Sequence, residues 1–227
     1  MKIAITGKGG VGKSTIAAAL AFRFKQLEKK VLAIDADPDS NLASALGIIE
    51  EIQKSITTIA HHQGLIEERT GAKIKEFGQI FKLNPEVDDI ADTYAYEHKG
   101  ISLLILGAVQ SGGSGCACPE NTLLRSLISS IILKKNEYVI LDMEAGVEHL
   151  GRATATGIDI MIIVVEPGYR SIESAKRIAS MAKDIGIQSL GIIINKVHSK
   201  DDIAYIKNNI PDYKILGTIE YSSHLLK

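Results

Sequence analysis

Residues 7–14 read G-K-G-G-V-G-K-S, and this stretch decides the fold. Its closely spaced glycines let successive backbone N–H groups turn inward as a nest that binds an anion. We expect Lys13 to reach the β- and γ-phosphates of a nucleotide, and Ser14 to place its hydroxyl on Mg²⁺. An apolar, β-prone run precedes the loop and a helical pattern follows it, as the motif requires. The predicted nucleotide-binding residues of this loop are Gly9, Gly10, Val11, Gly12, Lys13, Ser14 and Thr15.

Length and composition are those of one folded domain. The chain has 227 residues, of which 45% are apolar, and we expect a single domain over 1–227. A formal net charge of −1 gives no global attraction to nucleic acid or anionic lipid. The sequence contains no apolar run close to the roughly 18 residues of a membrane span, and its start does not resemble a signal peptide. We therefore expect a cytoplasmic protein that binds neither nucleic acid nor membrane.

Seven apolar runs alternate with helical patterns, and they define the predicted sheet. Their near-continuous hydrophobicity predicts strands that are buried on both faces. The fold class is therefore α/β, with a mainly parallel sheet of about seven strands and helices on both faces. A polar stretch at about 47–100 is too long for an ordinary connection, and we interpret it as short helices and a mobile insertion beside the site. The strands are expected at 2–6, 31–35, 101–106, 138–142, 160–165, 190–195 and 214–219, and the main helices at 15–28, 121–134, 172–185 and 201–209.

Acidic residues follow the second strand, where parallel sheets bind their ligands. Asp37 is the candidate that orients, or accepts a proton from, the water that attacks the γ-phosphate. Asp35 is expected to help hold Mg²⁺ or its waters. The alternative, that these acids cap the next helix, suits Asp39 and Ser40 better than Asp37.

Two further strand ends complete the predicted nucleotide site. Asp142 ends an apolar strand and is the expected magnesium-side partner of the phosphate loop. The residues after it, 143–146, can move with the state of the γ-phosphate. Asn195 ends another strand, where its amide could read the adenine edge; a turn-forming asparagine is the alternative.

The loop together with Asp35-Ala-Asp37-Pro38 resembles the deviant Walker A ATPases, which include the nitrogenase iron protein and the septum-site and partition ATPases. The resemblance implies that Lys8 is the signature lysine, which crosses a dimer interface to the partner's phosphates and so couples ATP binding to homodimer formation. It also implies the roles already given to Asp37, Asp142 and Asn195. Family members usually carry a proline near the base, where this chain has Glu220-Tyr221.

A cysteine pair, Cys116 and Cys118, lies in a glycine-rich stretch and is too closely spaced for an ordinary disulfide. In an extended segment both sulfurs share one side, which gives a metal half of a tetrahedral site. A two-fold dimer would supply four thiolates. Their chemistry suits Zn²⁺, Cu(I), Ni²⁺ or an iron–sulfur cluster, and idle thiols are the alternative.

The cysteine pair with residues 141–150 and 165–168 resembles the CooC-type ATPases. That resemblance implies a nickel chaperone for carbon monoxide dehydrogenase or acetyl-coenzyme A synthase. By thiolate chemistry, Zn²⁺ can occupy the same site. Glu148 and His149 could be auxiliary ligands, although a helix-surface role is favoured. Two other classes stay open: a positioning ATPase of the MinD or ParA kind, and an iron–sulfur cluster carrier.

Overall fold

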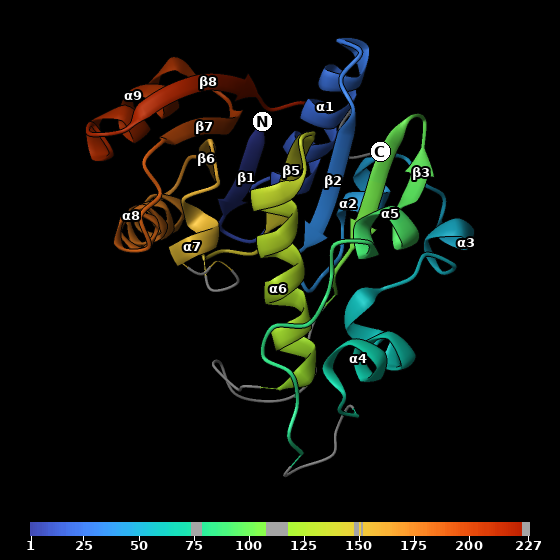
Figure 1. The fold of residues 1–227 in the computed structure, drawn as a ribbon. Helices are drawn as coiled ribbons and strands as arrows, with labels where there is room; N and C mark the ends of the chain where they lie inside the picture. Colours follow the sequence, from blue (N-terminus) through green and yellow to red (C-terminus); the bar gives the residue numbers. More distant parts are fainter. Residues whose placement is uncertain (74–78, 108–117, 148–149, 151, 224–227) are drawn as a thin grey trace.

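Eight strands form one sheet in the computed structural model, in the order β3-β4-β2-β5-β1-β6-β7-β8 (Figure 1). The structure describes residues 1–73, 79–107, 118–147, 150 and 152–223. Every neighbouring pair of strands is parallel except β3 and β4. The strands are β1 (Lys2–Gly7), β2 (Val31–Ala36), β3 (Tyr96–His98), β4 (Ile101–Ile105), β5 (Tyr138–Met143), β6 (Ile160–Val165), β7 (Leu190–Val197) and β8 (Lys214–Glu220).

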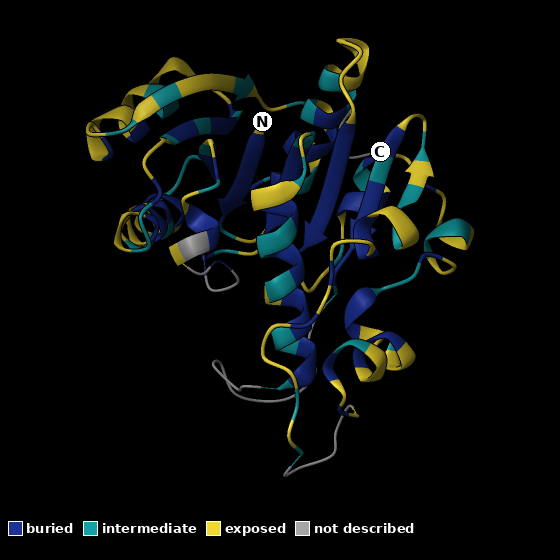
Figure 2. Ribbon diagram, viewed as in Figure 1, coloured by how far each residue is buried: buried dark blue, intermediate teal, exposed yellow. Residues whose placement is uncertain are grey.

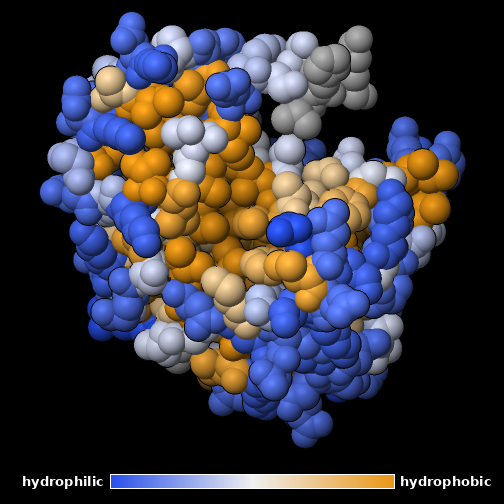
Figure 3. All heavy atoms as spheres, turned by 90° about the horizontal axis from the view of Figure 1, so that it is seen from above, coloured by the Kyte–Doolittle hydropathy of each residue, from blue (hydrophilic) through white to orange (hydrophobic). Residues whose placement is uncertain are grey.

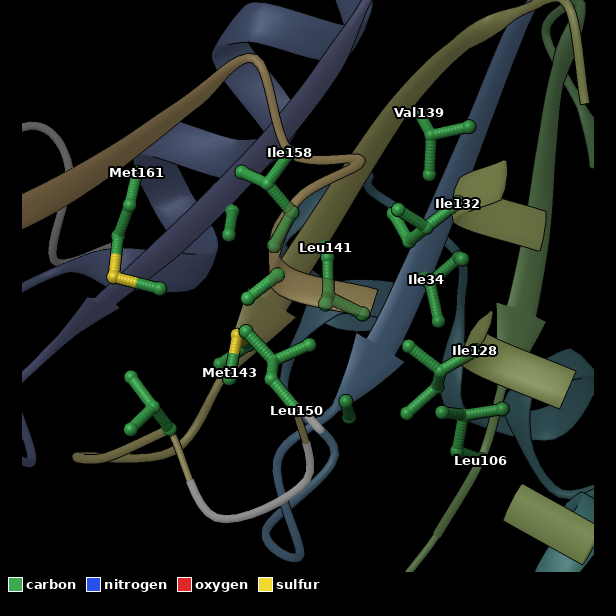
Figure 4. Packing of buried hydrophobic residues seen from close by; sticks show 14 of the residues in the cluster. Ile34, Leu106, Ile128, Ile132, Val139, Leu141, Met143, Leu150, Ile158 and Met161 are labelled. Carbon is green, nitrogen blue, oxygen red and sulfur yellow. The ribbon is translucent and has the colours of Figure 1, made fainter. Parts of the chain in front are cut away.

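Helices cover the sheet on both faces, because alternate residues of each buried strand point to opposite sides. Ile34 and Leu141 pack with α6 on one side, as Figure 4 shows. Ile3 and Ile140 pack with α1 on the other. The helices are α1 (Lys13–Gln26), α2 (Leu42–Ala45), α3 (Glu50–Gln53), the 3₁₀ turn η1 (Ile59–His61), α4 (Gln63–Thr70), α5 (Ile90–Tyr94), α6 (Pro119–Lys134), α7 (Arg152–Ala155), α8 (Tyr169–Asp184) and α9 (Lys200–Asn209).

The predicted α/β class is confirmed, and all seven expected strands are present. The additional strand, β3, has three residues, pairs antiparallel with β4 and lies inside the stretch interpreted as an insertion. Its partly exposed residues gave no apolar run from which to predict it. The sheet therefore has one more edge strand than the sequence indicated.

The stretch at about 47–100 forms short helices, as expected, and these helices also contribute to the core. Ile59, Leu65, Ile66 and Ile90 are fully buried or nearly so and belong to the same cluster as α6. In Figure 2 the helix α4 has one buried side and one exposed side. Mobility of this stretch stays a prediction.

The amino ends of β1 and β2 lie at the edge of the sheet opposite the phosphate loop (Figure 1). Seen from that side, apolar side chains gather near the centre of the surface inside a hydrophilic rim (Figure 3). The described part of the chain contains no helix with the length and apolar character of a membrane span.

Candidate nucleotide-binding site

The phosphate loop connects β1 to α1, and two of its glycines are required by close approaches. A side chain at Gly7 would place its Cβ 2.5 Å from the Val164 carbonyl oxygen of β6. Gly12 has a φ of 97° and lies where a Cβ would be 2.5 Å from the Asn195 amide nitrogen. Neither position accepts a larger residue without a shift of its neighbours. These approaches fix the loop against the ends of β6 and β7.

Lys13 and Asp37 lie together in the site, as their predicted roles require. The Lys13 Nζ is 3.4 Å from Asp37 Oδ2, and both side chains are largely buried. The lysine predicted to reach the phosphates therefore lies beside the carboxylate predicted to place the attacking water. A cavity of about 300 Å³ opens there, lined by Gly9, Gly10, Gly12, Lys13, Ser14, Thr15, Asp37, Asp39, Asn41, Glu144 and Ala145.

Asp142 fits the expected magnesium site. It is fully buried, and neither carboxylate oxygen has a hydrogen-bond partner within the described residues. Burial raises its pKa to about 6, while the nearby Ser14 hydroxyl and the charge of Lys13 act in the opposite direction. An unsatisfied buried carboxylate beside the loop serine is the hard oxygen donor set that Mg²⁺ prefers. Ser14 and Asp142 are thus the residues that would hold the ion.

Asp35 lies opposite Asp142 in the β2–β5 register and is also fully buried. Its Oδ1 accepts a hydrogen bond from the Asp37 amide at 3.2 Å, and its Oδ2 accepts one from the Leu42 amide at 3.0 Å. Burial raises its pKa to about 7, and these two amides oppose the rise. Asp35 therefore supports the segment that carries Asp37, and its expected role at Mg²⁺ stays a prediction. The side chain that accepts a hydrogen bond from the first amide of α2 is that of Asp35. The sequence had suggested Asp39 or Ser40 for this capping contact.

Thr6 is a site residue that sequence reasoning missed. Its buried hydroxyl donates to the Glu144 carbonyl at 2.7 Å and accepts from the Gly146 amide at 3.3 Å. These bonds tie the segment after Asp142 to the strand before the phosphate loop. The sequence offered one signal for this role, a hydroxyl in a mostly apolar strand directly before the glycine loop. The structure buries that hydroxyl fully, so it needs hydrogen-bond partners.

Asn195 contacts the phosphate loop from the end of β7, and its predicted reading of the adenine edge stays a prediction. Its buried Nδ2 donates to the Val11 carbonyl at 2.7 Å. A second cavity of about 350 Å³ begins there, and Tyr221 stacks on His198 near it with ring centroids 4.6 Å apart. This cavity, on the loop side opposite Asp37, suits a nucleotide base. It is lined by Gly10, Gly12, Thr15, Ile16, Ala19, Asn195, Lys196, Ile219, Glu220, Tyr221 and Ser222.

Lys8 lies at the surface end of the loop and makes an ion pair within its own chain. Its Nζ is 3.3 Å from Glu166 Oε1, and 40% of its side chain is exposed. Glu166 lies in the stretch 165–168 that carries the resemblance, but neither it nor its second partner, Lys196, was predicted as a site residue. The predicted crossing of Lys8 to a partner stays a prediction.

The cysteine pair is only partly within the described residues. Cys118 is half-buried and directly precedes α6. Cys116, Glu148 and His149 lie outside the residues that the structure describes. Among those that it does describe, no three or more histidine, cysteine, aspartate or glutamate residues form a group able to hold a metal.

Comparison with known proteins gives consistent results. The family described as the CobQ/CobB/MinD/ParA nucleotide binding domain matches residues 2–227. The carbon monoxide dehydrogenase accessory protein CooC of Rhodospirillum rubrum is 47% identical over 223 residues, which are 98% of this chain and 84% of that protein. An uncharacterized ATP-binding protein of Methanocaldococcus jannaschii is 46% identical, over 100% of this chain and 88% of its own length. The MinD cell division protein of Aquifex aeolicus shares the fold, with a TM-score of 0.66 at 23% identity, over 100% of this chain and 85% of that one.

Proposed function

We propose that this chain, which belongs to the CobQ/CobB/MinD/ParA family of nucleotide-binding domains and is an ATPase, is a nickel chaperone. The enzyme that receives the nickel would be carbon monoxide dehydrogenase or the related acetyl-coenzyme A synthase. The observation that carries the proposal is the 47% identity with the CooC accessory protein over 98% of the chain. The Cys-x-Cys pair at 116 and 118 supplies thiolates for the cargo.

The buried residues of the site perform the hydrolysis. Lys13 binds the phosphates and neutralises charge that builds on the γ-phosphoryl group. Asp37, 3.4 Å from Lys13, orients the attacking water and accepts its proton. Ser14 and Asp142 would hold Mg²⁺, and the bound ion would neutralise phosphate charge. The loop amides and the Asn195 contact on the loop keep this geometry assembled.

Nucleotide binding and cargo binding are coupled through a homodimer in this scheme. Lys8 of each protomer contacts the nucleotide of the other, so that two Cys-x-Cys segments meet and four thiolates hold one nickel ion. Loss of the γ-phosphate releases the segment after Asp142, the interface relaxes, and the metal passes to the acceptor enzyme. ATP and nickel must then raise each other's affinity by the same factor.

Anaerobic equilibrium dialysis with nickel, combined with light scattering, tests the proposal with and without ATP. We expect one nickel per dimer, tighter binding when ATP is present, and loss of that nickel in the variant Cys116→Ser with Cys118→Ser. Because neither cysteine belongs to the predicted nucleotide-binding residues, the variant should still bind ATP. Nickel that persists in the variant, or an affinity unchanged by ATP, would show the scheme to be wrong.

An anaerobic visible spectrum, added to this experiment, separates the two other classes. A cluster carrier purified without oxygen would be brown and absorb broadly in the visible range. A positioning ATPase, the class suggested by the fold it shares with MinD, would dimerise with ATP but bind no cysteine-dependent metal.

A further inference from the structure

Three charged side chains meet where β1, β6 and β7 end. Gly7 of β1 faces Val164 of β6, and Val165 faces Ile194 of β7. Because parallel strands end at the same edge, residues at their carboxyl ends lie side by side. Lys8 and Glu166 directly follow β1 and β6, and Lys196 is the second-last residue of β7. The Glu166 carboxylate lies 3.3 Å from Lys8 and 3.0 Å from Lys196, so one negative charge serves two lysines.

Lys196 is the more firmly fixed of the two lysines. Its Nζ donates to the Gly10 carbonyl of the phosphate loop at 2.6 Å. Its backbone has a φ of 56°, which is uncommon for a residue with a side chain, and the β7–β8 register shifts beside it. The neighbouring Asn195 holds the Val11 carbonyl. Two residues at the end of β7 therefore donate hydrogen bonds to consecutive carbonyls of the loop.

These two hydrogen bonds orient the loop for binding of nucleotide phosphates. A trans peptide directs its C=O and the next N–H in opposite directions. A Val11 carbonyl held against Asn195 therefore turns the Gly12 N–H away from β7. Inward N–H groups of this kind bind the phosphates. Lys196 and Asn195 thus position the loop, and Lys196 also positions Glu166.

Lys8 has no such second anchor in the contacts of the described residues, and its only ion pair there is with Glu166. We propose that Glu166 is a positioning residue that retains Lys8 in its own chain, and that this contact must open before Lys8 can reach the nucleotide of a second copy. The inference rests on the proposed nucleotide-driven dimer. Glu166 would then oppose dimerisation until nucleotide and partner together attract Lys8 more strongly.

The expected effect is modest, because the Lys8–Glu166 pair is partly exposed. Pairs of this kind favour their closed form by about 1.5- to 5-fold. A dimer opens one contact in each protomer, so the two factors multiply to about 2- to 25-fold. Glu166→Gln should therefore lower the dimer dissociation constant by about 2- to 25-fold at saturating ATP.

A second variant is expected to change dimerisation in the opposite direction. Lys196→Gln leaves Glu166 to Lys8 alone, which strengthens the retained contact and should raise the dimer dissociation constant. Loss of the Gly10 contact also weakens ATP binding, so both variants are measured at saturating nucleotide by sedimentation velocity. General damage to the fold would weaken dimerisation in both variants, whereas the proposal requires opposite signs.

Glu173→Gln is the matched control, since it removes the same charge from a different ion pair, Glu173–Lys176 on α8. It should dimerise as the parent does. NMR of ¹³C-methylated lysines gives a direct readout, and the Lys8 signal is identified by its absence in Lys8→Ala. Without nucleotide, the Lys8 chemical shift should change in Glu166→Gln and should not change in the Glu173→Gln control.

Two results separate failure of this inference from failure of the proposed function. If Lys8→Ala abolishes ATP-dependent dimerisation while Glu166→Gln dimerises as the parent does, Glu166 does not retain Lys8 and the inference is overturned. If Lys8→Ala dimerises normally, Lys8 does not act across the interface, and both the dimer scheme and this inference fall. An unmoved Lys8 signal in Glu166→Gln also overturns the inference.

Discussion

The nucleotide site and the segment between β2 and β4 bury different kinds of residue. At the site, charged side chains are buried: Lys13, Asp35, Asp37 and Asp142 are each at most 7% exposed. In the described part of the segment at about 47–100 the buried residues are apolar, apart from Thr70. Burying charge is unfavourable unless a partner compensates it, and a nucleotide with its cation supplies that partner. The buried residues of the site are therefore suited to bind a charged ligand, whereas those of the segment stabilise its packing against α6.

The largest expected effect tests the chemical half of that comparison. Lys13→Ala should reduce ATP hydrolysis by about 1,000-fold, because it removes a cation expected to neutralise the developing phosphate charge. Steady-state release of phosphate measures the change. Lys29→Ala, which alters an exposed lysine beyond α1, is the control and should leave the rate within about twofold.

Asp37→Asn should slow hydrolysis by about 100-fold, because the amide cannot accept a proton from the attacking water. Nucleotide affinity should change little, which a fluorescent ATP analogue can measure. Asp39→Asn alters an exposed acid that lines the same cavity and should change the rate by less than about threefold. Equal losses in the two variants would exclude a special role for Asp37.

A change in the segment should affect stability instead of chemistry. Ile66→Ala empties a fully buried position on α4 and should lower the free energy of unfolding by about 2–5 kcal/mol. Urea denaturation measures this, and the folded fraction should hydrolyse ATP at a rate within about threefold of the parent. Ile80→Ala, at a position 96% exposed, should change stability by less than about 0.5 kcal/mol. A comparable loss at both positions would mean that the segment does not pack as described.

The smallest expected effect is at Thr6, whose hydroxyl joins β1 to the segment after Asp142. Thr6→Val leaves the Glu144 carbonyl and the Gly146 amide without their buried partner, which should lower unfolding stability by about 1–3 kcal/mol. Hydrogen exchange should increase at residues 144–147 more than elsewhere. Thr6→Ser keeps the hydroxyl and should keep that protection. If serine and valine give the same exchange, the hydroxyl does not hold the segment.

Much of the nucleotide site could be predicted, because its residues follow one another in short motifs after apolar strands. Lys13, Asp37 and Asp142 lie near one another as expected, since parallel strands end at one edge. The contact of Asp35 with the Leu42 amide was not predicted, because it depends on the path of the chain between β2 and α2. The pattern of the sequence carries no information on that path.

Contacts between distant residues were the other omission. Thr6 and Glu144 are 138 positions apart, and Lys196 and Gly10 are 186 apart. Neither pair belongs to a motif with fixed spacing. The strand β3 was missed for a different reason: its three residues are stabilised by pairing with β4, which overrides their weak local preference.

The central place of β1 in the sheet has a consequence for synthesis of the chain. Lys2 donates its amide proton to Asp159, 157 residues later, and β1 pairs only with β5 and β6. Ribosomes add about 5–20 residues per second, so the first strand emerges roughly 8–30 s before its last neighbour exists. Until β5 is complete, this apolar segment and its glycine loop lack both of the strands that flank them in the sheet. The part of the protein predicted to bind nucleotide is thus among the first to be made, but both of its neighbouring strands are complete only after residue 160.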